Sequence, residues 1–340
     1  MVANSAQQWD AFVRTHPRGH LLQLSRWGQL KAAFGWEAER VTLTGSDGQL
    51  IGGAQILFRP LPMRLGKVAY LPMGPYVENE AHTDRLWQAI HTCAREHGAR
   101  FIKWEPGIYM ADEPTPTPTA YNFQASVQTV QPPRTILIDI RADDETILAR
   151  MNQGTRRKIR QGPKKDVRFY HGDEADVTRF TNMMQTTGNR NEFGVHDPAY
   201  YRMAYDLFKD SGEVTLIMAE HEGDALAGIM VFALGRFAWY VYGASASIKR
   251  NLMATYGIQW EAIKWARSQG CDYYDMWGIP DEDETTLEAQ FKDRSDGLWG
   301  VYGFKRGWGG DVVRSLGTWD MPYNPVIYQA YKVALNWRGV

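Results

Sequence analysis

A stretch close to the C-terminal end, residues 296–315, combines glycines, aromatic rings and a lysine in a pattern that suits a reaction site. It contains six glycines and, between them, Trp299, Tyr302, Phe304, Lys305, Arg306 and Trp308. Glycine lets the backbone approach a ligand closely, aromatic rings offer rigid contact area, and a desolvated ammonium is a strong point charge. The simpler interpretation is a strand-turn-strand corner whose aromatic side chains fill a core.

A second candidate is a cluster of cations in residues 150–165. Its members are Arg150, Arg156, Arg157, Lys158, Arg160, Lys164 and Lys165. The formal net charge of the whole chain is −1, so this concentration of positive charge is local. It suits a phosphate backbone, and it lacks the interleaved aromatic residues that stack on bases. A solvated helix end, where cations favour the carbonyl dipole, is the alternative.

Carboxylates and histidines offer fewer candidates. Glu105 follows Trp104 at the end of an expected strand, where a carboxylate beside a cleft can accept a proton or bind a hydroxyl. His196 lies in a loop before an expected helix, where it either contacts a ligand or is a surface or capping residue. The acidic run 281–284 more simply charges the start of a helix.

Several classes of protein are not indicated. The sequence holds no GxSxG, HExxH, Walker or Rossmann motif, and its histidines show no metal spacing. Cys93 and Cys271 are far apart and read as free thiols of a reducing compartment. No basic segment followed by an apolar run opens the chain, and no apolar run approaches the roughly 18 residues that span a bilayer. We therefore expect a cytoplasmic protein without a membrane-spanning segment, a metal or a cofactor.

The elements that must position these residues occur twice. A hairpin, a strand, a helix and a further strand in the first half return in the same order in the second half. Trp87 aligns with Trp260 at an offset of 173, and Gly98 with Gly270 at an offset of 172. A nearly constant offset indicates duplication, and 340 residues favour two domains. Each repeat is expected to be a mixed, mostly antiparallel sheet flanked by helices, an α+β fold.

Taken in order, the motifs resemble the Fem family of peptidyltransferases (the FemX/FemA/FemB type). Members transfer an amino acid from aminoacyl-tRNA to a peptidoglycan precursor. The matching segments cover nearly the whole chain and include LQLSRWGQLKAAFGW, FIKWEP, NQGTRRKIRQGPK, YGASAS and GLWGVYGFKRGWGG. The resemblance implies two GNAT-like domains, residues 1–140 with 317–340 for the precursor and residues 141–316 for the tRNA acceptor end. No sustained heptad pattern is present, so the chain resembles the compact type without a coiled coil.

The resemblance also implies roles for single residues. Lys31 matches a lysine that contacts the precursor's phosphates, and Glu105 falls near an acidic residue of the same site. Tyr200 and Tyr256 match tyrosines that line the precursor cleft, and His196 stands where the family can carry a phosphate-binding arginine. Phe304 and Lys305 match a pair beside the tRNA acceptor end. The cations expected to bind tRNA are Arg156, Arg157, Lys158, Arg160, Lys164 and Lys165.

The implied reaction is aminolysis of an activated ester, in which Lys305 stabilises the oxyanion or holds the terminal phosphate of the tRNA. The implied partners are aminoacyl-tRNA and a precursor that is either nucleotide-linked (UDP-MurNAc-pentapeptide) or lipid-linked (lipid II), with peripheral membrane contact in the second case. We expect a monomer. An N-acyltransferase that uses acyl-CoA is the first alternative, although no convincing Q/R-x-x-G-x-G/A loop for a pyrophosphate is present. A non-catalytic tRNA-binding module is the second.

Overall fold

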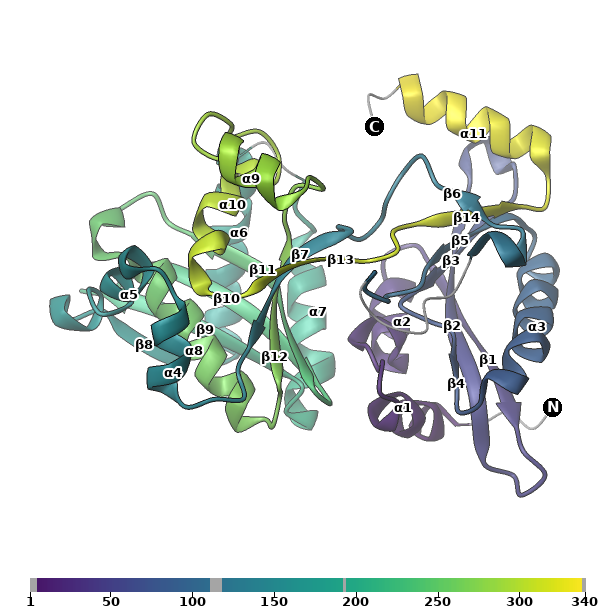
Figure 1. Ribbon diagram of the computed structural model, residues 1–340, viewed down its shortest axis with the longest axis horizontal. Helices are drawn as coiled ribbons and strands as arrows, with labels where there is room; N and C mark the ends of the chain where they lie inside the picture. Colours follow the sequence, from purple (N-terminus) through teal and green to yellow (C-terminus); the bar gives the residue numbers. More distant parts are fainter. Residues whose placement is uncertain (1–4, 111–117, 192–193, 338–340) are drawn as a thin grey trace. The chain divides into compact units, whose positions relative to one another are not determined.

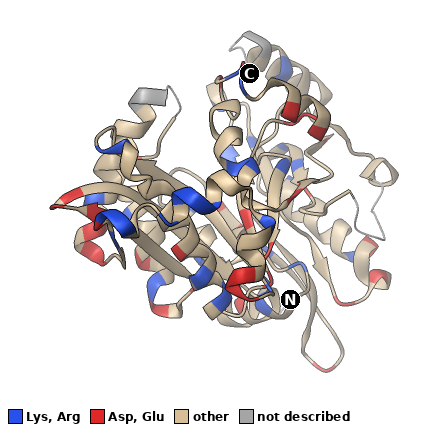
Figure 2. Ribbon diagram, turned by 60° about the vertical axis from the view of Figure 1, so that its left-hand side comes forward, with Lys and Arg blue, Asp and Glu red and all other residues tan. Residues whose placement is uncertain are grey.

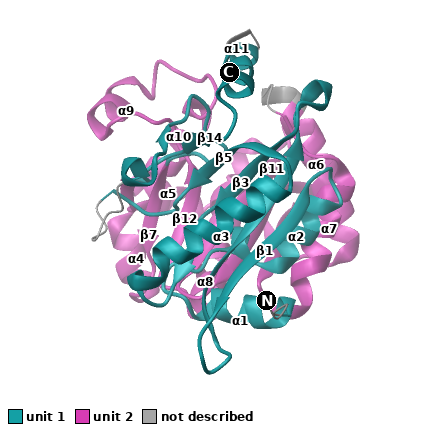
Figure 3. Cartoon of the chain, turned by 90° about the vertical axis from the view of Figure 1, so that its right-hand side faces the viewer, with its two compact units in different colours: residues 1–133, 314–340 teal, residues 134–313 magenta. Residues whose placement is uncertain are grey.

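The computed structural model describes residues 5–110, 118–191 and 194–337 (Figure 1). The chain forms two compact units: unit 1 comprises residues 1–133 and 314–340, and unit 2 comprises residues 134–313 (Figure 3). These divisions lie a few residues from the boundaries expected at 140 and 317. The extreme ends of the predicted first domain, residues 1–4 and 338–340, lie outside the described residues.

Unit 1 is built on one mixed sheet. Its strands are ordered β1-β2-β3-β5-β14-β6, and β4 pairs with β2. The strands are β1 (Glu37–Thr44), β2 (Leu50–Pro60), β3 (Lys67–Pro72), β4 (Tyr76–Val77), β5 (Ala99–Glu105), β6 (Gln124–Ala125) and β14 (Trp319–Pro322). The helices are α1 (Ala6–Thr15), α2 (Ser25–Ala32), α3 (Thr83–Glu96) and α11 (Pro325–Trp337).

Alternation along β2 explains how both faces of this sheet are covered. Ile56 and Phe58 point to one face and join the core that includes residues of α3. Gln55 points to the other face, where its backbone and side-chain amides bond to Gln23 and to the carbonyls of residues 22 and 24, just before α2. Gly28 of α2 lets the helix approach closely, because a Cβ there would lie 2.5 Å from the Gln55 side chain.

Unit 2 is built on a second mixed sheet, ordered β13-β7-β12-β11-β10-β9-β8. Its strands are β7 (Arg134–Asp139), β8 (Arg168–His171), β9 (Val214–His221), β10 (Asp224–Leu234), β11 (Phe237–Ser245), β12 (Tyr273–Gly278) and β13 (Asp311–Arg314). Its helices are α4 (Asp144–Arg150), α5 (Gln153–Ile159), α6 (Glu174–Asn191), α7 (Pro198–Phe208), α8 (Ala254–Ser268), α9 (Glu284–Gln290) and α10 (Trp299–Lys305).

The two units repeat one topology. In each, two helices precede an antiparallel hairpin, β1–β2 or β9–β10, and a third strand pairs antiparallel with the hairpin. A helix, α3 or α8, then leads to a strand that is parallel to the third one, β5 to β3 and β12 to β11. A final strand, β14 or β7, closes on it antiparallel. The predicted duplication is thus visible strand by strand, and the aligned Trp87 and Trp260 are both buried.

The structure differs from the sequence-based expectation in two places. The acid-led pattern of residues 143–165 predicts one helix, but two are formed. Met151 and Asn152 are extended, and the Asn152 side chain accepts a 2.7 Å hydrogen bond from the amide of Thr155, which starts α5. Residues 299–305 form a helix rather than a strand-turn-strand corner. Trp299, Tyr302 and Lys305 share its buried side.

No helix among the described residues has the length and apolar content required to cross a bilayer.

Candidate functional site

Lys305 ends α10 with its side chain inside unit 2. Only 6% of the residue is exposed, and its ammonium donates hydrogen bonds to the carbonyls of Gly278 (2.7 Å) and Trp277 (3.3 Å). Burial lowers the pKa of Lys305 to about 7, against the opposing effect of the Asp275 carboxylate. At neutral pH the group therefore changes charge readily when an anion binds or leaves.

The end of β12 holds these two carbonyls in place. Trp277 has a left-handed backbone with a φ of 61°. The carboxylate of Asp275 fixes this turn, because it accepts a 2.7 Å hydrogen bond from the Trp277 amide and another from the hydroxyl of Thr135 on β7. A short acidic side chain thus sets the position of the lysine indirectly.

Beside Lys305 lies a group of rings that we call the aromatic cluster, formed by Tyr256, Phe304 and Trp308. The Tyr256 ring meets Phe304 edge-on at 4.9 Å and stacks on Trp308 at 6.0 Å. Lys158 of α5 donates a 3.0 Å hydrogen bond to the Tyr256 hydroxyl. The structure therefore brings together three predicted site residues from three helices, α5, α8 and α10: Lys158, Tyr256 and Phe304. Lys305 directly follows Phe304 at the end of α10.

His196 and Tyr200 form a separate aromatic group at the start of α7. Their rings stack at 3.9 Å, and the Tyr200 hydroxyl lies 3.4 Å from that of Tyr242 on β11. The amide of His196 donates to the hydroxyl of Tyr201. Burial raises the pKa of Tyr200 to about 12, so its hydroxyl stays protonated and can donate a hydrogen bond.

In unit 1, Lys31 lies close to a second cation, Arg59, to which no sequence pattern pointed. Burial, together with the charge of Arg59, lowers the pKa of Lys31 to about 8. The Lys31 ammonium lies 5.2 Å from the centre of the Trp27 ring, and the Arg59 guanidinium lies 5.3 Å from that of Trp36. The two positive charges repel each other, and each lies over a tryptophan ring. An anion bound between them would reduce this repulsion.

Glu105 is fully engaged within unit 1. One carboxylate oxygen accepts hydrogen bonds from the amides of Val130 (2.8 Å) and Gln131 (3.0 Å) and from the hydroxyl of Thr318 (2.6 Å). The other accepts from the hydroxyl of Tyr70, whose ring lies 6.2 Å from that of Trp36. The predicted role of Glu105 in precursor binding stays a prediction, and the geometry supports an action through Tyr70 and the neighbouring loop.

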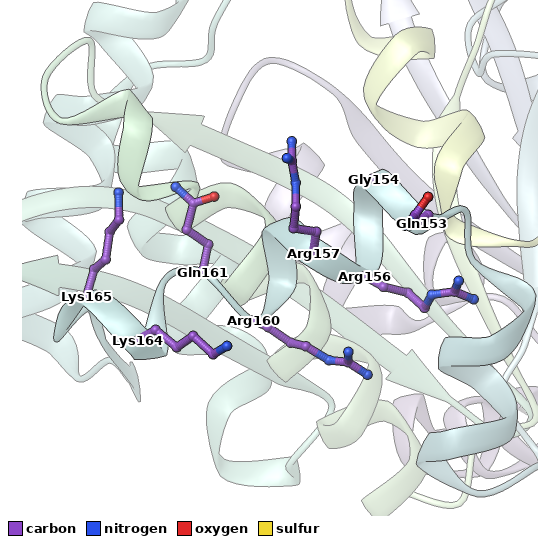
Figure 4. A pocket seen from close by; sticks show the side chains of 8 residues that line it. All are labelled: Gln153, Gly154, Arg156, Arg157, Arg160, Gln161, Lys164 and Lys165. Carbon is purple, nitrogen blue, oxygen red and sulfur yellow. The ribbon is translucent and has the colours of Figure 1, made fainter.

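The basic segment around α5 borders an open hollow of about 810 Å³, which we call the cationic hollow (Figure 4). It is lined by Gln153, Gly154, Arg156, Arg157, Arg160, Gln161, Lys164 and Lys165. Figure 4 shows two rows with a spacing of four residues, one formed by residues 156, 160 and 164 and the other by residues 157, 161 and 165. Lys158 points to Tyr256 instead.

The charge of the cationic hollow is local and is not neutralised by ion pairs. Lysine and arginine alternate with aspartate and glutamate over much of the chain in Figure 2, in line with the net charge of −1. Within the part of the chain that the structure describes, the five cations lining the hollow take part in no ion pair with a carboxylate. Such a surface suits a polyanion.

Sequence reasoning missed Asp275, Arg59 and Tyr242. Arg59 and Tyr242 lie beside Lys31 and Tyr200 only in the folded chain, and Asp275 acts on Lys305 through the turn at Trp277, so no spacing in the sequence signals these contacts. Among the described residues there is no group of three or more histidine, cysteine or acidic side chains able to hold a metal ion.

Relatives of known name resemble this chain over its whole length. The lipid II:glycine glycyltransferase of Staphylococcus saprophyticus is 24% identical over 395 residues, which cover 95% of this chain and 93% of the relative. The protein of the same name from Staphylococcus aureus is 24% identical over 403 residues with the same coverage. Both alignments are longer than this chain of 340 residues, so the relatives carry insertions that it lacks.

Solved structures show the same fold. The crystal structure of FemX matches with a TM-score of 0.86 at 23% identity, covering 96% of this chain and 98% of that one. A tandem GNAT protein from the clavulanic acid biosynthesis pathway matches with a TM-score of 0.53 at 13% identity, covering 94% of each chain. The predicted α+β fold of two GNAT-like repeats is thereby confirmed.

The match to a family model confirms the resemblance that was based on the motifs. The model of the FemAB family matches residues 5–224 and, in a second match, residues 216–336. Together the two matches span nearly all of the sequence, and the chain belongs to the FemAB family.

Proposed function

We propose that this chain transfers an amino acid from aminoacyl-tRNA to an amine of the peptidoglycan precursor's stem peptide, as in formation of an interpeptide bridge. One observation carries the proposal: a buried lysine, Lys305, directly follows Phe304 of the aromatic cluster in a chain of the FemAB family. Two relatives, each aligned over 93% of its own length, are named lipid II:glycine glycyltransferase, which supports the same class of reaction here.

The chemistry is aminolysis of an ester. The amine nitrogen of the stem peptide attacks the acyl carbon, the new C–N bond forms, and the C–O bond to the ribose breaks. The proton lost by the amine ends on the ribose hydroxyl that leaves. Negative charge gathers on the acyl oxygen between these events, and a charged Lys305 would stabilise it or hold the terminal phosphate of the tRNA. Because an ester is already activated, alignment of the two substrates supplies much of the acceleration.

The cationic hollow is the proposed surface for the tRNA backbone. Its five cations are free of carboxylate partners among the described residues, and Lys158 links the same helix to Tyr256. We therefore propose that the hollow binds the phosphate backbone of the tRNA and does not distinguish its bases. A charged tRNA donor also places the reaction in the cytoplasm.

Lys31 is the proposed contact to the phosphates of the precursor, with Arg59 as its neighbour. A diphosphate is common to nucleotide-linked and lipid-linked precursors, and an anion between the two cations would favour the charged form of Lys31. The names of the staphylococcal relatives favour the lipid-linked form. We propose further contacts from Tyr200, Tyr256 and His196, and an indirect contribution from Glu105.

The test is to offer the full-length protein a pool of charged tRNAs with nucleotide-linked and lipid-linked precursors, and to identify products by mass. We expect the precursor to gain the mass of one or more amino acids, with loss of activity in the Lys305→Ala variant. Turnover of acyl-CoA without discharge of aminoacyl-tRNA would show the acyl-CoA alternative. Binding of tRNA without either product would show the non-catalytic one.

A further inference from the structure

Helix α11 of unit 1 is apolar on two sides. Its inner side packs against Phe101 through Tyr328 and its neighbours, with Tyr328 2% exposed. Its outer side, which we call the outer face of α11, is formed by Val326, Ala330, Val333 and Ala334, with one polar residue, Gln329, among them. Val326 is 79% exposed and Val333 is 53% exposed. Exposed apolar side chains grouped on the solvent side of a helix are typical of a contact surface.

Two loops add exposed apolar side chains next to this helix. The β2–β3 loop packs under α11 through Leu61 and Leu65 and leaves Met63, at its tip, 86% exposed. On the other side, Val127 is 53% exposed and precedes Gln128, whose side chain accepts a 2.8 Å hydrogen bond from the Tyr331 hydroxyl. Exposed apolar side chains of unit 1 therefore gather around α11.

The segments around this patch carry a net positive charge. Residues 61–67, 126–133 and 322–337 contain Arg64, Lys67 and Lys332 but no carboxylate. Lys67 pairs with Glu37 at 2.6 Å, whereas the stem of Lys332 lies along Tyr328 with its ammonium 5.1 Å from the ring centre. Because Glu37 neutralises Lys67, Arg64 and Lys332 carry the positive charge of these segments, and apolar side chains flanked by such cations match the surface of an anionic bilayer.

A second copy of this chain is a poorer fit to the same patch. A twofold contact would bring the patch against itself, and its cations would face each other. An anionic lipid surface meets the same cations with charges of opposite sign and accepts the apolar side chains among its acyl chains.

We propose that the outer face of α11, with the tip of the β2–β3 loop, docks this protein on an anionic bilayer. The inference rests on the proposed function in one respect, since docking serves the reaction when the precursor is lipid-linked. It would hold the enzyme at the surface where that precursor is embedded and raise the encounter rate in two dimensions.

The experiment is co-sedimentation of the full-length protein with vesicles of phosphatidylglycerol and phosphatidylcholine, compared with vesicles of phosphatidylcholine alone. We expect binding to the anionic vesicles that weakens with salt. Val326→Asp/Val333→Asp and the uncharged Val326→Ser/Val333→Ser should each reduce it at least tenfold, and Met63→Asp should also weaken it. Ile248→Asp, which adds a carboxylate at an exposed apolar residue of unit 2, should bind as wild type.

Unchanged vesicle binding in both double variants would overturn the proposal. So would a concentration-dependent dimer of the wild type that the same variants abolish, because the face would then bind a second copy. Activity separates this inference from the proposed function: the double variants should keep wild-type kcat/KM on a water-soluble precursor and lose it on precursor embedded in vesicles. Vesicle binding that depends on the outer face, without transfer to either precursor, would contradict the proposed function and support docking.

Discussion

The ammonium of Lys158 lies 4.6 Å from the centre of the Tyr256 ring and donates a 3.0 Å hydrogen bond to its hydroxyl. Lys158 is therefore the cation of the basic segment that points away from the cationic hollow and toward the aromatic cluster. This contact links the helix proposed to bind tRNA with the rings beside Lys305. Arg157 and Lys158 are adjacent in the sequence but have different neighbours in the folded chain. Substituting each of them should therefore affect a different property of the enzyme.

Lys158→Met should lower kcat about tenfold, which corresponds to roughly 1.4 kcal/mol for the lost cation–ring contact and hydrogen bond together. The affinity for tRNA should change little. Arg157→Met, the matched variant in the hollow, should weaken tRNA binding at all sequences and reduce the slope of log K against log salt by roughly 0.7–0.9. Filter binding over a salt series, with single-turnover rates, measures both. Identical behaviour of the two variants would show that Lys158 acts only as a phosphate contact.

Lys305→Ala should lower kcat by roughly 10²–10³ and change KM for the precursor much less, because the lost charge acts where negative charge develops. The ammonium form is the active one and burial lowers the pKa of Lys305 to about 7, so the activity assigned to Lys305 should fall as pH rises through that value. Lys305→Arg, which stays charged, should lack this limb of the pH–rate profile. Lys292→Ala, an exposed lysine nearby, is the control. A limb that persists in Lys305→Arg would assign it to another group.

The same lysine should make stability depend on pH. Its pKa is about 7 when folded and near 10.4 when unfolded, so between these values the unfolded chain binds more protons and stability rises with pH. From pH 7 to pH 9 the wild type should gain roughly 2 kcal/mol relative to Lys305→Met. Urea unfolding of both proteins at the two pH values measures this difference. Parallel changes in the two proteins would mean that Lys305 is not buried as described.

Arg59→Gln should raise the pKa of Lys31 toward its ordinary value, because the charge of Arg59 now contributes to lowering it. If the pair binds the precursor's diphosphate, KM for precursor should rise about tenfold in Arg59→Gln with kcat unchanged. Lys31→Gln should have a similar effect, and the double variant should lose less than the sum. Arg40→Gln, an exposed arginine of β1, should leave KM unchanged. Full additivity would place the two cations at independent sites.

Elements with strong local patterns were predictable from the sequence. The amphipathic pattern of residues 82–97 predicts a helix, which the structure shows as α3 (Thr83–Glu96), and the hairpins expected in both halves are β1–β2 and β9–β10. The duplication was predictable because each repeat packs an equivalent helix, α3 or α8, against equivalent strands. This shared packing places a buried tryptophan at matching positions, Trp87 and Trp260.

Other features depend on contacts that the sequence does not reveal. Residues 299–305 contain two glycines, each of which weakens a helix by about 1 kcal/mol, yet they are helical because Trp299, Tyr302 and Lys305 are buried together. The same limit applies to the site: the residue types of Lys305 and Phe304 were informative, whereas Asp275 and Arg59 lie near Lys305 and Lys31 only in the folded chain.

The position of β14 in the sheet of unit 1 has a consequence for how the protein is made. This strand lies between β5 and β6, its Asp320 pairs with the buried Lys103 at 2.9 Å, and the adjoining Thr318 donates to Glu105. During synthesis, all of unit 2 leaves the ribosome before these residues do. Unit 2 is continuous in sequence, so all of its strands and helices are available once it has been synthesised. Lys103, in contrast, precedes its counter-ion Asp320 by some two hundred residues, so this ion pair can form only after Asp320 has been synthesised. Synthesis of unit 1 therefore begins first, but unit 2 is complete before unit 1.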